Sequence, residues 1–148
     1  MNNFDELLDD GIFEWENFPE IARALVHVDK HSLSDEMMKL PSQYAYYHTL
    51  MVKAQTRANA SEGEVEKYKA NKSKECQELQ ASSGKKATAK DMENYVNSST
   101  EYLNRCRDYR QLQEKYLTLK GLVQAVGIKR DMLIQLSSNE RAETKLYN

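Results

Sequence analysis

The chain has 148 residues, of which 23 are acidic and 21 are basic, for a formal net charge of −2. Leu, Ile, Val and Phe together number 29, just under a fifth of the chain. So little apolar content suits a disordered protein only when the net charge is high, which excludes that class here. No apolar run approaches the length of a membrane span.

The charge is unevenly placed along the chain. Residues 1–40 carry ten acidic and three basic side chains, whereas residues 41–148 carry thirteen acidic and eighteen basic ones. We therefore divide the chain into an acidic N-terminal head, 1–40, and a basic body, 41–148. Such an asymmetry indicates a polyanionic or acidic partner for the body. The alternative is a solvated surface on which head and body pair with each other.

The head is expected to fold as short helices. Asn17 can cap a helix that has Pro19 in its first turn. Ser34 can start a further turn. Trp15 and Phe18 are expected to anchor the head by packing onto the same chain or onto a neighbouring copy.

The first long helix of the body is expected to begin at Pro41, with apolar residues in heptads as far as Leu79. Gly63 costs about 1 kcal/mol relative to Ala in a helix, so a bend or a weak point is expected near Ser61–Gly63. The polar stretch 81–87 reads as a loop. Thr88 with Asp91 after it is a capping signal for the next helix.

Four tyrosines seven residues apart mark the last helix: Tyr95, Tyr102, Tyr109 and Tyr116. The stripe predicts one helix from about Ala89 to about Ser137, continuing toward Tyr147. With a loop near Gly84 the two long helices pair antiparallel. Tyr68 then meets Tyr102, and Ala54 and Ala58 lie opposite Tyr116 and Leu112.

The expected fold is thus all-α, a long antiparallel helical hairpin preceded by short N-terminal helices. A hairpin buries little surface per residue, so we expect a coiled-coil-like, oligomeric protein whose copies complete the core. The self-assembling segment is predicted to be 109–136. Its contact residues are predicted to be Leu112, Tyr116, Leu119, Val123, Val126 and Leu133.

No catalytic, cofactor or metal signature is present in the sequence. His27, His31 and His48 have no metal-binding spacing to other ligand residues, and Cys76 and Cys106 form no CxxC pair. Both cysteines are expected to be reduced thiols. No acid–base pair or activated nucleophile emerges, so we expect no enzyme.

Basic residues gather toward the hairpin tip. A cluster of this kind is typical of a surface that binds a phosphate backbone, with plain solubility as the alternative. Tyr68 and Tyr95 lie among the lysines and either stack on unpaired bases or pack between the helices. The predicted DNA-binding residues are Lys67, Lys69, Lys72, Lys74, Lys85 and Lys86.

In layout, residues 33–146 resemble the UvsY-type recombination mediators of tailed phages. Lys67 and Lys69 match a Lys-x-Arg pair that contacts DNA in that family, with Lys here in place of the Arg. That exchange keeps the charge but loses bidentate phosphate pairing. The tail from Leu122 to Leu133 is similar to the family's C-terminal helix in its order of small residues, a basic pair and an apolar stripe.

The resemblance implies a non-enzymatic recombination mediator that binds single-stranded DNA as an oligomeric ring. It implies as partners a RecA-like recombinase, single-strand-binding protein and further copies of the chain, with no membrane and no cofactor. The acidic start lacks an apolar signal segment, so we expect a cytoplasmic protein, in the host cell's cytoplasm if a phage encodes it.

Two other interpretations stay open from the sequence. One is a coiled-coil structural, adaptor or inhibitor protein that binds a protein partner through its acidic head. The other is an acidic DNA mimic built around residues 1–40, which would compete with DNA for a DNA-binding partner.

Overall fold

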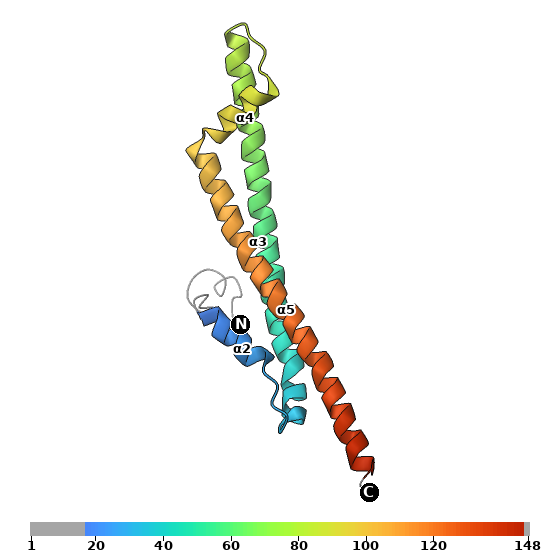
Figure 1. Cartoon of the computed structure of the whole chain (residues 1–148). Helices are drawn as coiled ribbons and strands as arrows, with labels where there is room; N and C mark the ends of the chain where they lie inside the picture. Colours follow the sequence, from blue (N-terminus) through green and yellow to red (C-terminus); the bar gives the residue numbers. More distant parts are fainter. Residues whose placement is uncertain (1–16, 147–148) are drawn as a thin grey trace. The chain divides into compact units, whose positions relative to one another are not determined.

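A computed structural model describes residues 17–146 (Figure 1). This part of the chain holds four helices and no strand: α2 (Phe18–Val26), α3 (Leu33–Ser82), α4 (Ala89–Asn97) and α5 (Thr100–Leu146). The expected all-α class is confirmed. None of these helices has the length and apolar character needed to cross a membrane. The proposed anchor Trp15 lies outside the described residues.

The chain divides into two compact units. The first joins residues up to Lys53 with those from Tyr116 onward, and the second comprises Ala54–Lys115. The long helices α3 and α5 each contribute a segment to both units. The boundary that charge indicates at residue 40 lies inside the first unit.

Helix α2 contributes to the core of the first unit. It has proline in its first turn as predicted, and Asn17 stands at its N-cap position, although the Asn17 side chain makes no capping hydrogen bond. Phe18, the other proposed anchor, packs against this core. The buried members of the core come from α2, α3 and α5 and are Leu25, Leu33, Leu40, Leu122, Val126 and Leu133.

Helix α3 begins at Leu33, so the predicted start at Pro41 is wrong. Pro41 lies inside the helix, where a proline costs about 3 kcal/mol because it removes a backbone hydrogen bond. Leu33 and Leu40 are seven residues apart, share one helix face and are both buried in the core. We infer that this packing carries the helix across the proline. The predicted weak point at Gly63 does not interrupt α3, which continues to Ser82.

The connection after α3 follows the sequence prediction. Gly84 adopts a positive φ of 71°, a conformation that glycine reaches without a steric penalty. The backbone N–H of Lys85 then donates to the carbonyl of Gln80, a pattern typical of helix C-termini. Thr88 and Asp91 form a complete capping box at the start of α4, which confirms the predicted cap.

The single last helix that the tyrosine stripe predicts is wrong, because it is broken after Asn97 into α4 and α5. Ser98 ends α4. The Ser99 hydroxyl accepts the backbone N–H of Tyr102 at 3.3 Å, as an N-cap residue does. It also lies 3.0 Å from the hydroxyl of Tyr68 on α3. Two serines therefore satisfy the backbone groups that a continuous helix would have paired internally.

Within the second unit, α3 runs antiparallel to α4 and α5. The Tyr95 hydroxyl donates to Glu75, and the Tyr109 hydroxyl donates to Glu62. The residue number therefore rises along α4 and α5 as it falls along α3. This is the register predicted from the pairing of Tyr68 with Tyr102. Two small residues of α3, Ala54 and Ala58, are buried as expected. The other buried hydrophobic residues of this unit are Val65, Cys76 and Val96.

One lysine is buried in the core of the first unit. Lys129 on α5 is only 3% exposed. Its Nζ lies 2.6 Å from a carboxylate oxygen of Glu36 in the first turn of α3. The same Nζ donates to the carbonyl of Leu25, near the end of α2, at 2.9 Å. This ammonium therefore ties all three helices of the unit together and satisfies one carbonyl at a helix terminus.

We predict that Lys129→Met lowers the free energy of unfolding by about 3 kcal/mol, because it leaves the partly exposed carboxylate of Glu36 without its cation and the Leu25 carbonyl without its donor. Adding Glu36→Leu should recover most of that loss, since both charges are then gone. Denaturant titration followed by circular dichroism measures both. Arg130→Met is the control, because Arg130 is exposed and pairs with its neighbour Asp131. Equal stability of the Lys129→Met and Arg130→Met chains would contradict the assignment.

Candidate nucleic-acid interface

The predicted DNA-binding lysines all lie in the second unit, but they do not form one patch. Lys67 and Lys74 are seven residues apart on α3 and share a helix face. Lys69 is two residues from Lys67 and therefore projects from a different face. Lys85 and Lys86 lie in the connection between α3 and α4. The four lysines of α3 therefore do not all project from one face of that helix.

Lys72 is held by neighbouring side chains. Its Nζ forms an ion pair with Glu75 at 2.7 Å and lies over the rings of Tyr68 and Tyr95, 6.0 and 5.7 Å from their centroids. The hydrogen bond that Lys72 donates to Glu75 raises the pKa of Lys72 and lowers the pKa of Glu75. Lys72 thus joins α3 to α4. Lys74 lies 3.9 Å from Glu78 in an exposed and therefore weak pair.

The remaining four lysines are exposed and pair with no carboxylate in the part of the chain that the structure describes. They are Lys67, Lys69, Lys85 and Lys86. From Lys67 to Lys90 the chain carries seven basic side chains against two acidic ones. The unpaired cations are therefore the ones available to a phosphate backbone.

Tyr68 and Tyr95 are engaged between the helices. Besides its contact with Ser99, the Tyr68 ring lies 5.0 Å from the guanidinium of Arg105. The Tyr95 hydroxyl donates to Glu75 at 3.0 Å, which raises the pKa of Tyr95. These contacts favour packing between helices over base stacking for both tyrosines.

A cleft of about 370 Å³ lies beside the break between α4 and α5. Lys69 and Ser73 of α3 line one side of it, and the ring of Tyr102 from α5 lines another. Met92, Glu93 and Asn97 of α4 also contribute. The sequence prediction missed this cleft because the heptad stripe hides the break. The run Ser98-Ser99-Thr100 of residues that favour helix caps was the signal for it.

The predicted assembly residues lie mostly inside the chain. Leu112 and Tyr116 are half-buried. The other four, Leu119, Val123, Val126 and Leu133, are between 0 and 8% exposed. All four side chains are already packed against other residues of this chain. Their part in assembly stays a prediction. Substitutions at these four residues would affect assembly by disturbing the fold of the first unit.

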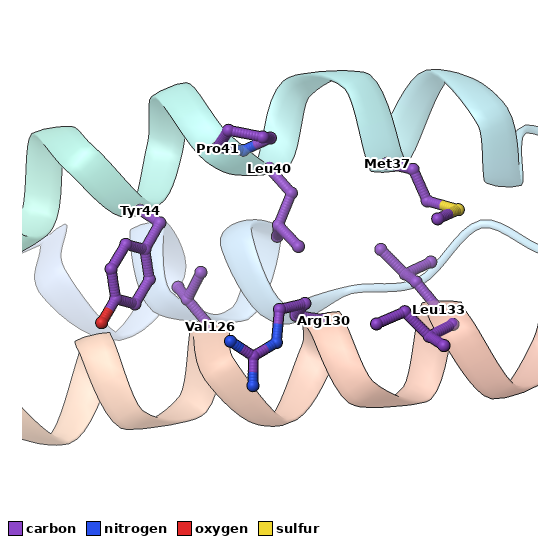
Figure 2. A pocket seen from close by; sticks show the side chains of 8 residues that line it. Met37, Leu40, Pro41, Tyr44, Val126, Arg130 and Leu133 are labelled. Atoms are coloured by element: carbon purple, nitrogen blue, oxygen red, sulfur yellow. The ribbon is translucent and has the colours of Figure 1, made fainter.

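The first unit has an apolar groove of about 410 Å³ on the face that α3 and α5 share (Figure 2). Met37, Leu40 and Tyr44 project into it from α3 and meet Val126 and Leu133 from α5. Arg130 supplies the one cationic group among the lining residues, and its guanidinium pairs with Asp131. This groove has the character of a contact surface for apolar side chains.

No group of three or more His, Cys, Asp or Glu residues that could hold a metal ion occurs within residues 17–146. Cys76 is a buried free thiol, and Cys106 is a half-buried one. The three histidines are surface or loop residues, and His48 stacks on Tyr44.

Comparison with known proteins yields no match to any family model, any curated protein or any solved structure. The resemblance to UvsY-type mediators therefore rests on the layout of residues 33–146 and on the residues given for it.

The contact between Lys72, Glu75 and Tyr95 predicts a change in titration. Glu75→Gln should lower the pKa of Tyr95 toward its ordinary value, because the carboxylate that disfavours the phenolate is removed. Ring resonances of Tyr95 followed by NMR against pH measure this. Glu78→Gln is the matched control, since Glu78 pairs with the exposed Lys74. An unchanged Tyr95 titration in the Glu75→Gln chain would show that the contact does not form.

Proposed function

We propose that this chain is a non-enzymatic protein that binds single-stranded DNA through the second unit. The observation that carries the proposal is the set of four exposed, unpaired lysines, Lys67, Lys69, Lys85 and Lys86, in a stretch with a large excess of positive charge. Lys74 supports them, since its weak exposed pair is easily exchanged. Lys72 contributes charge but remains bound within the protein.

The chemistry of these lysines suits binding to a phosphate backbone and not recognition of a particular base sequence. A lysine ammonium is a flexible point charge, and it binds phosphate without the bidentate geometry that arginine imposes. Each site is therefore weak and salt-dependent. Several copies of the site on one assembly would bind one strand multivalently and raise the overall affinity without new contacts.

The proposed role in the cell is that of a recombination mediator. An oligomeric, coiled-coil-like ring would hold the strand and help a RecA-like recombinase replace single-strand-binding protein. This part of the proposal rests on the resemblance to UvsY-type proteins. Because the core positions of α5 are already buried, we propose that copies meet through exposed apolar side chains on one face of the helix. These are Leu117, Ile128 and Met132.

Charge reversal at Lys67 and Lys69 should weaken binding to a single-stranded oligonucleotide and reduce its salt dependence. Losing two phosphate contacts reduces the magnitude of the negative slope of log K against log salt by about 1.4. Filter binding across a salt series measures both effects. The control reverses Lys39 and Lys145, exposed lysines of the first unit, so that net charge changes equally. Equal effects of the two double variants would overturn the site assignment.

Assembly predicts a mass well above the 17.2 kDa of one chain. Ile128→Glu with Met132→Glu should reduce that mass, because two charges would enter a contact between copies. Sedimentation with and without an oligonucleotide measures it. Met38→Glu, at an exposed residue of α3, is the control and should leave the assembly intact. A wild-type chain that sediments as a monomer at high concentration would exclude the ring.

The apolar groove of the first unit supports a second candidate function. A structural, adaptor or inhibitor protein would use such a groove to hold an apolar segment of a protein partner (Figure 2). It would bind no oligonucleotide at any salt concentration. The filter-binding series therefore separates this function from the first one.

A further inference from the structure

The cleft beside the break between α4 and α5 is built by a local departure from the heptad pattern. Ser98 ends α4 and Ser99 caps the start of α5, so α4 leaves the line of α5 (Figure 1). The gap that results is lined by three helices of one unit. At about 370 Å³ it lies at the lower end of the range for small-molecule sites, a size that suits one planar base.

The side chains around the cleft match the parts of a nucleotide. Tyr102 offers a half-buried aromatic ring. Lys69 offers an exposed ammonium that pairs with no carboxylate in the described residues. Ser73 and Asn97 offer groups that donate and accept hydrogen bonds. Glu93 adds a carboxylate to the lining, which repels phosphate, whereas Lys69 attracts it.

Tyr102 differs from the other tyrosines of the second unit in its surroundings. The hydroxyls of Tyr68, Tyr95 and Tyr109 contact Ser99, Glu75 and Glu62 across the helices. Burial, and after it the Cys106 thiol, raises the pKa of Tyr102. Tyr102 is half-buried and lines the cleft.

We propose that this cleft receives one unpaired base of a single-stranded nucleic acid, which stacks on Tyr102 while Lys69 binds the adjacent phosphate. The inference rests on the proposed function and adds to it a base-binding subsite. Stacking on an aromatic side chain does not depend on the identity of the base. Double-stranded DNA keeps its bases paired and gains nothing from the cleft.

The test compares two oligonucleotides of equal length, one of natural single-stranded DNA and one with abasic sugars throughout. Tyr102→Leu should weaken binding of the natural strand about fivefold or more, from the loss of base stacking. It should leave binding of the abasic strand unchanged. Tyr102→Phe should retain wild-type affinity for both. Tyr109→Leu, seven residues along the same stripe, is the matched control and should not discriminate between the strands.

The outcomes separate this inference from the proposed function. A wild-type protein that binds neither strand defeats both. A protein that binds both strands, with Tyr102→Leu equal to wild type, overturns the base subsite and leaves backbone binding in place. An equal loss on both strands shows that Tyr102 only supports the fold, and this also overturns the subsite. A loss confined to the natural strand supports it.

Discussion

The Ser99 hydroxyl occupies the point on which the arrangement of the second unit depends. It caps α5 through the N–H of Tyr102 and contacts the Tyr68 hydroxyl of α3. A helix can end where side chains satisfy its free backbone groups. Because this cap is anchored to α3, α4 is set apart from α5, and the cleft with Lys69 opens beside the break. In this unit a structural cap and a candidate binding site are parts of one feature.

The lysines of the second unit differ in the contacts that they already make within the protein. Lys72 lies between two tyrosines and pairs with Glu75, so its charge serves the contact between α3 and α4. In the first unit Lys129 is buried and bound to Glu36 and a backbone carbonyl. A cation in such a position is costly to unpair and contributes little to an external partner. The exposed lysines that lack such partners carry the proposed function.

Much of the fold follows from the sequence because the signals are local. The loop glycine, the capping box at Thr88 and the antiparallel register all follow from short-range chemistry and heptad spacing. The errors arise where packing or polar contacts between residues distant in sequence determine where a helix begins or breaks. Burial of Leu33 with Leu40 carries α3 across Pro41, and the contact from Tyr68 favours a break that the tyrosine stripe conceals. The lysine positions were visible in the sequence, and the pairs of Lys72 with Glu75 and of Lys74 with Glu78 lie within one helix, but the contact of Lys72 with Tyr95 depends on the neighbouring helix.

The central claim is that unpaired lysines of the second unit bind a phosphate backbone. Acetylation of lysines, mapped by mass spectrometry with and without a single-stranded oligonucleotide, tests it at each residue. The account predicts protection of Lys67, Lys69, Lys85 and Lys86, with Lys39 modified equally in both states. Uniform modification with and without the oligonucleotide, or protection confined to lysines of the first unit, would contradict it.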